Sequence, residues 1–96
     1  MLNQKKLNTK LINNLPRVQK EEQTLSFASG QGYIDMNYTL PTGATLLLGV
    51  LNGRPNPDWI SADISAIGVD SCRISYNNTY SSTLSGTVTL KLLYTL

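Results

Sequence analysis

The stretch GTVTLKLLYTL, residues 86–96, decides the fold that the sequence predicts. Alternate residues from Val88 to Leu96 are apolar, and the positions between them are threonine or lysine except for Leu93. This period of two is typical of a β-strand, whereas a helix would spread the same apolar residues around its circumference. We therefore expect a central strand with earlier strands paired to both of its edges, in an all-β domain.

Composition limits both the size of the protein and its chemistry. At 96 residues, with 41% hydrophobic and 15% charged residues, the chain is long enough for one domain. The single cysteine, Cys72, excludes an internal disulfide, and we expect it to be a small core residue. There is no histidine, which removes the commonest general base and metal ligand. We therefore expect no enzyme, no metal and no cofactor.

The first twenty residues differ in charge from the remainder of the chain. They hold five basic residues and no acid, whereas the remainder holds three basic and six acidic residues. Leu7, Leu11 and Leu15 are spaced by four, which predicts a short helix over residues 2–15 that stops at Pro16. We predict an attachment segment over residues 1–20 and a β-domain over residues 21–96. The basic charge indicates contact with nucleic acid, a membrane surface or an acidic protein, or else a solvated helix face.

No apolar run is long enough to cross a bilayer. The lysines near the start are followed by no continuous apolar block and no small-residue cleavage site, so we expect no secretory signal peptide.

About six strands alternate with turn signals. The expected strands cover residues 23–29, 33–40, 44–51, 59–66, 71–76 and 86–96. We expect a polar linker over residues 17–22, and a hairpin that joins the first two strands through Gly30-Gln31-Gly32. The count and spacing of strands favour a small antiparallel β-sandwich, jelly-roll-like, preceded by the short N-terminal helix.

The strand at residues 44–51 is apolar on both faces. Alternation places Leu46, Leu48 and Val50 on one face and Leu47 and Leu51 on the other. Leu93 likewise lies on the otherwise polar face of the last strand. The second surface that buries these leucines is either another subunit or the N-terminal helix or a loop of the same chain. The candidate residues of an oligomer interface are Leu7, Leu11, Leu15, Leu47, Leu51 and Leu93.

Two polar loops hold the candidate ligand contacts. The loop at residues 52–58, with the adjoining Trp59, brings together a cation, an amide, an acid and an aromatic ring, the groups that sugar sites use. The loop at residues 77–85 adds a second aromatic ring. The alternative is that the tryptophan closes the end of the sandwich and the first loop only turns. The candidate contacts are Arg54, Asn56, Asp58, Trp59 and Tyr80.

Both ends of the chain resemble a known group of proteins. The segments LNTKLINNLP (residues 7–16) and SGTVTLKLLYTL (residues 85–96) are similar to small bacteriophage virion proteins: fibre or tail-fibre knobs and head-fibre (decoration) proteins. The resemblance implies a β-sandwich homotrimer whose N-terminal segment attaches to the virion or continues a shaft. The middle of the chain matches only in the rhythm of its strands, and no binding residue is carried over.

The resemblance favours a trimeric fibre knob that adheres to the host surface. The alternatives are a capsid decoration protein anchored by its basic N-terminal segment, and a free-standing carbohydrate-binding module of jelly-roll type. The expected partners are copies of the chain, other virion proteins through residues 1–20, and a host cell-surface glycan. We expect no nucleic acid partner and no insertion into a membrane. The expected location is the virion, after synthesis in the cytoplasm of the bacterial host.

Overall fold

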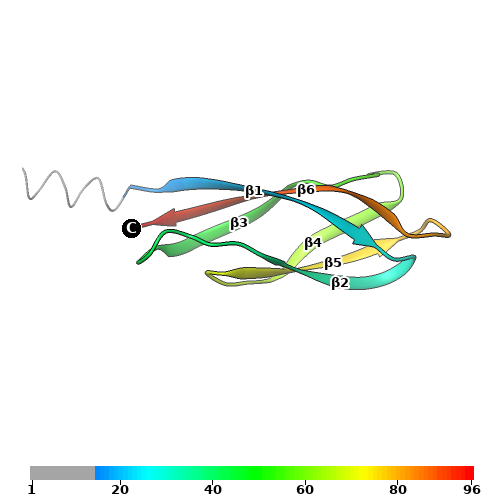
Figure 1. Cartoon of the computed structure of the whole chain (residues 1–96), viewed down its shortest axis with the longest axis horizontal. Helices are drawn as coiled ribbons and strands as arrows, with labels where there is room; N and C mark the ends of the chain where they lie inside the picture. Colours follow the sequence, from blue (N-terminus) through cyan, green and yellow to red (C-terminus); the bar gives the residue numbers. More distant parts are fainter. Residues whose placement is uncertain (1–14) are drawn as a thin grey trace, which may run out of the picture.

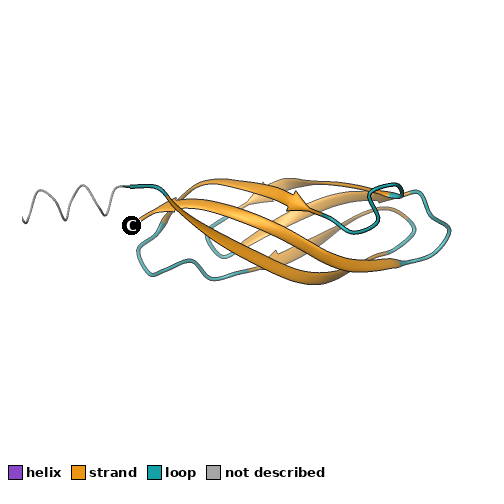
Figure 2. Ribbon diagram, turned by 90° about the horizontal axis from the view of Figure 1, so that it is seen from above, coloured by secondary structure: helices purple, strands orange, loops and turns teal. Residues whose placement is uncertain are grey.

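The computed structural model describes residues 15–96, which form six antiparallel β-strands and no helix. Figures 1 and 2 show two layers of strands in an elongated, twisted, sandwich-like arrangement. The predicted helix lies outside the described residues except for Leu15, which is exposed just before the first strand. The strands are β1 (Arg17–Phe27), β2 (Gly30–Asn37), β3 (Thr45–Gly53), β4 (Ile60–Ile67), β5 (Ser71–Asn78) and β6 (Leu84–Thr95).

The six strands divide into two three-stranded sheets. One sheet has the order β1-β6-β3 and the other the order β2-β5-β4. The last strand is central in its sheet, as the sequence predicts, because it pairs with β1 on one edge and with β3 on the other. Its alternate residues Val88, Leu90 and Leu92 are completely buried between the sheets. The predicted all-β fold of about six strands is confirmed.

The linker predicted over residues 17–22 is wrong, because these residues are the first half of β1. Their inward positions are polar, which hides the strand in the sequence. The amide groups of Gln19 and Gln23 donate hydrogen bonds to the carbonyl oxygens of Thr39 and Asn37, at 2.8 and 2.7 Å. Glutamines thus join the two sheets along an edge where most strands would bury apolar groups. The division of the chain into an attachment segment (residues 1–20) and a β-domain (residues 21–96) stays a prediction. Its boundary after Lys20 falls inside β1.

The predicted hairpin between the first two strands is also wrong. β1 pairs with β6 and β2 pairs with β5, so the chain crosses from one sheet to the other after Phe27. Gly30 has φ 92°, a conformation that side-chain-bearing residues rarely adopt, and it begins β2. The connection between the two strands is therefore residues 28–29, and the predicted turn residues Gln31 and Gly32 lie inside β2.

The assignment of the leucines of β3 to two faces is wrong because the strand contains a bulge. Its register with β6 shifts between Leu46 and Leu48, so Leu47 has no partner in the ladder. The phase of alternation changes there, and Leu51 packs against the core. Leu47, Leu48 and Val50 are exposed. The strand is thus apolar on both faces, but with different members on each face than alternation predicts.

Tyr38 ties the segment after β2 to the turn between β4 and β5. Only 6% of the residue is exposed. Its hydroxyl donates to the carbonyl oxygens of Gly68 and Ser71, and its backbone N–H donates to the carbonyl oxygen of Asp70. Burial raises the pKa of Tyr38 to about 12, from an ordinary 10.0.

The raised pKa predicts a loss of stability at high pH. Below pH 10 the phenol is protonated in both the folded and the unfolded chain, and its full contribution is present. Between pH 10 and about 12 the unfolded chain loses the proton first, so the free energy of unfolding falls by up to about 3 kcal/mol. The substitution Tyr38→Phe should cost about 1–3 kcal/mol at pH 7, because the carbonyl of Gly68 loses its donor, whereas the carbonyl of Ser71 still accepts from the N–H of Gly68.

Urea unfolding at pH 7, 9 and 11 measures both effects. In Tyr38→Phe the free energy of unfolding should fall less at high pH than in the wild type, because the phenol is absent. Some loss should remain in both proteins, because burial also raises the pKa of the Cys72 thiol. An identical alkaline loss in the two proteins would contradict the assignment to Tyr38.

Candidate functional site

Two exposed aromatic rings meet at one end of the sandwich. Trp59 comes from the loop between β3 and β4, and Tyr80 from the loop between β5 and β6; their ring centroids are 5.1 Å apart with an interplanar angle of 63°. The two residues are 47% and 39% exposed. Figure 1 shows these loops at the end opposite the C-terminus and the start of β1. The structure thus joins two candidate contacts that the sequence places in separate loops.

Backbone hydrogen bonds fix the position of the tryptophan. The N–H groups of Trp59 and Ile60 both donate to the carbonyl oxygen of Asn56, which has φ 50°, a left-handed conformation that asparagine tolerates. The N–H of Thr79 donates to the carbonyl oxygen of Trp59 at 2.9 Å. This bond extends the pairing of β4 with β5 by one residue pair beyond Ile60 and Asn78. Trp59 therefore continues the β4 ladder and is held by more than its own loop.

The loop before Trp59 is also anchored on its other side. The Nε–H of Arg54 donates to the carbonyl oxygen of Ile60 at 2.6 Å, so the guanidinium closes the loop on itself. The ring of Pro55 covers Gly86 so closely that a Cβ on that glycine would lie 2.3 Å from the Cβ of the proline. A glycine is needed there because any side chain would push the loop off β6.

Asn78 connects three segments at this end of the molecule. It is 1% exposed, and among residues 15–96 it is the one polar residue that is buried. Its amide group donates to the carbonyl oxygens of Phe27 and Ser82, each at 3.0 Å, and its side-chain oxygen accepts from the N–H of Tyr80 at 2.9 Å. The position of Tyr80 therefore depends on a side chain that the sequence analysis treated as part of a polar loop.

The other predicted contacts lie beside the aromatic pair with different roles. Asn56 and Asp58 are exposed on the same loop as Trp59, and no hydrogen bond joins their side chains to another described residue. Arg54 is engaged with the backbone of its own loop, as described above. The alternative, that the tryptophan closes the end of the core, stays a prediction; Trp59 is 47% exposed, whereas Phe27 and Ile60 are buried.

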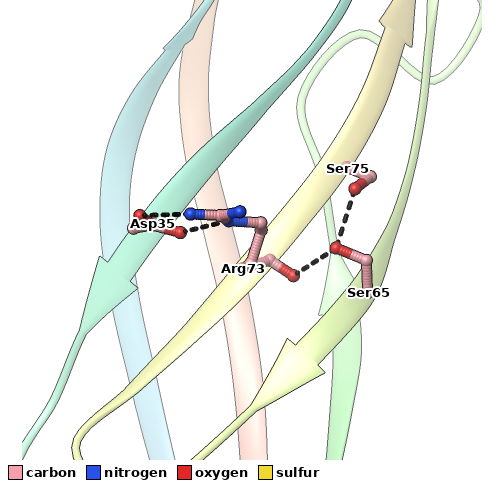
Figure 3. A network of polar contacts seen from close by, with 4 residues as sticks. All are labelled: Asp35, Ser65, Arg73 and Ser75. Atoms are coloured by element: carbon pink, nitrogen blue, oxygen red, sulfur yellow. Dashed lines mark hydrogen bonds and ion pairs between the residues drawn. The ribbon is translucent and has the colours of Figure 1, made fainter.

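A second polar surface, missed by the sequence analysis, is the outward face of β2-β5-β4. Arg73 on β5 and Asp35 on β2 are cross-strand partners and form a bidentate ion pair (Figure 3). The Nε and Nη2 atoms of Arg73 lie 2.9 and 3.3 Å from the carboxylate oxygens. This hydrogen bond lowers the pKa of Asp35. The same guanidinium lies 3.9 Å from the ring centroid of Tyr33, which stays 60% exposed. Alternation alone could have shown this face, since its outward positions are nearly all polar.

The possible metal ligands and the cysteine of the described residues are dispersed or buried. Among residues 15–96, no three histidine, cysteine, aspartate or glutamate side chains gather as a metal ion would require. Cys72 is buried, as predicted, and burial raises the pKa of its thiol, which keeps it protonated at neutral pH. The same part of the chain contains no helix that is long and apolar enough to span a membrane.

No family model, curated protein or solved structure matches the chain. The functional assignment below therefore rests on the geometry of the chain itself and on the resemblance of its two ends.

Proposed function

We propose that this protein is a non-catalytic adhesion domain of a bacteriophage fibre, which contacts a neutral host-surface glycan through Trp59 and Tyr80. The observation that carries the proposal is the exposed pair of rings. They lie at the end opposite the start of β1 and the end of β6, which we call the attachment end. Aromatic rings of this kind pack against the apolar faces of sugar rings, and the amide of Asn56 and carboxylate of Asp58 on the same loop can hydrogen-bond sugar hydroxyls.

The position of the aromatic pair, opposite the start of β1 and the end of β6, favours a role for these rings in adhesion. The start of β1 and the end of β6 lie at one end of the molecule, and the loops that hold the aromatic pair lie at the other (Figure 1). A segment that attached the domain to a larger particle would therefore point the rings away from it. Loops on a rigid sandwich can also vary without disturbing the packed sheets.

The fold that we propose is a shortened jelly roll. The strands are nested as in a long antiparallel hairpin rolled on itself, with β1 paired to β6, β2 paired to β5, and β3 and β4 as the innermost strands, one in each sheet. An eight-stranded jelly roll has one more nested pair. Jelly rolls occur in viral structural proteins and in lectins, which is compatible with both halves of the proposal.

We further propose a homotrimer, assembled through the outward face of β1-β6-β3. Val18, Leu93 and Leu48 are cross-strand neighbours there and form an apolar row across three strands. Val18 and Leu48 are 62% and 55% exposed. A second copy of the chain would cover this row near the attachment end and leave the aromatic end free. A monomer that binds sugar would instead favour the free-standing carbohydrate-binding module.

The binding proposal predicts that Trp59→Ala lowers affinity for a host-surface glycan at least tenfold, about 1.4 kcal/mol, and that Tyr80→Ala has a smaller effect in the same direction. Binding should be measured to purified host cell walls and to neutral oligosaccharides, with circular dichroism to verify folding. Val69→Ala, at an exposed position in the turn between β4 and β5, is the control for general loss of exposed apolar surface. Unchanged binding by folded Trp59→Ala would contradict the proposal.

A further inference from the structure

The outward face of β2-β5-β4 contains an open depression that begins beside the aromatic pair. Its volume is about 460 Å³. The residues that line it and face outward are all polar: Gln31, Ser61, Asp63, Ser75 and Asn77. The register explains the shape, because the short side chain of Ser75 on the central strand lies between Tyr33 on one neighbouring strand and Asp63 on the other. We call this depression the trough.

The trough continues the site at the end of the sandwich. Trp59 is opposite Thr79 in the extended β4–β5 pairing, and two residues later Ser61 is opposite Asn77. Residues two apart on a strand face the same side, so Trp59 and Ser61 share the outward face. Asp63 is four positions after Trp59, roughly 13 Å along an extended strand. The exposed ring of Tyr33 is level with Ser75 and Asp63 across the strands, and it borders the part of the trough that is farther from Trp59.

The chemistry of the trough suits a neutral, hydroxyl-rich ligand. Amide and hydroxyl side chains can each donate and accept hydrogen bonds, as sugar hydroxyls require. The charge of Asp35 next to the trough is already paired with Arg73 (Figure 3). Asp63 remains as an acceptor, and one of its oxygens accepts from the N–H of Ile64. An unpaired carboxylate repels anionic polymers but accepts hydrogen bonds from sugar hydroxyls.

We propose that the trough binds an extended neutral glycan chain that runs along the strands, with one sugar unit against Trp59 and Tyr80 and a more distant unit against Tyr33. This inference rests on the proposed glycan-binding function and specifies its ligand as an internal stretch of polysaccharide. A site restricted to the two loops would hold a single sugar unit or a disaccharide. A site that includes the trough gains affinity as the glycan becomes longer.

The test compares glycan length against a variant that fills the trough. The probes are β-linked glucose, β-linked N-acetylglucosamine and α-linked rhamnose oligosaccharides of two and six units, measured by calorimetry or by NMR titration. In Ser75→Ile the floor of the trough is raised and a hydroxyl is lost, while the strand tolerates a β-branched residue. Thr87→Ile is the matched control, because Thr87 is exposed on the central strand of the opposite sheet.

The wild type and Thr87→Ile should bind a hexasaccharide at least tenfold more tightly than the corresponding disaccharide. Ser75→Ile should lose this difference and keep its affinity for the disaccharide, whereas Trp59→Ala should lose affinity for both. If wild type binds both lengths equally, or if Ser75→Ile keeps the preference for length, the trough is not part of the site, although a disaccharide affinity that depends on Trp59 still supports the proposed function. If wild type binds none of these probes, both proposals are wrong.

Discussion

Asn78→Leu is expected to lower the free energy of unfolding by about 3–5 kcal/mol, although it replaces one loop-adjacent polar residue with an apolar one of similar size. The reason is that leucine fills the space but leaves the carbonyl groups of Phe27 and Ser82 and the N–H of Tyr80 without their partners. The bond to Phe27 is buried and the other two are partly buried, and a buried group that loses its hydrogen bond costs about 1–3 kcal/mol. Domains of this size are typically stable by only about 5–15 kcal/mol in total.

Asn77→Leu is the matched control, because the preceding residue has the same side chain and faces outward on the same strand. Its cost should stay below about 1 kcal/mol. Urea unfolding followed by tryptophan fluorescence measures both variants, since Trp59 lies next to this region. Equal costs for the two substitutions would show that Asn78 does not hold the three segments together.

Leu90→Ala is expected to cost about 2–5 kcal/mol, the range for truncating a buried leucine that leaves a cavity. Leu90 is completely buried on the central strand, opposite Glu21 on β1 and Leu51 on β3. Leu93 lies three residues later on the outward face of the same strand. Comparison of Leu90→Ala with Leu93→Ala therefore measures how strongly each face of the sheet is buried.

For a single chain in solution, Leu93→Ala should cost less than about 1 kcal/mol at every protein concentration. For the proposed homotrimer its cost should be larger and should depend on protein concentration, because association stabilises the folded state by mass action. Unfolding at two concentrations, together with light scattering, separates these outcomes. A monomeric mass with a small, concentration-independent cost would contradict the homotrimer, and a negligible cost for Leu90→Ala would contradict the position of β6 in the core.

The candidate site was only partly predictable from the sequence. Trp59 and Tyr80 stand out because aromatic residues are unusual in polar loops, but their contact depends on two loops 20 residues apart being brought to one end. Asn78 carries no distinguishing signal, because Asn77 beside it is chemically identical. The trough depends on which strands are neighbours, and that information is absent from the alternation of any one strand.

The sequence by itself determined the all-β class and the central position of the last strand, because both follow from local alternation and from the high apolar content of one segment. It also located the core positions of β6 from Val88 to Tyr94, and Cys72 as a core residue of β5. Only the tertiary structure decided the pairing partners, which separated the first two strands into different sheets. It also decided that polar residues 17–22 form a strand, since Gln19 within them and Gln23 just after them donate to carbonyl oxygens at and just beyond the end of β2. The bulge in β3 likewise follows from its fit to β6, because pairing between distant strands selects which residues face inward whenever a strand is apolar on both sides.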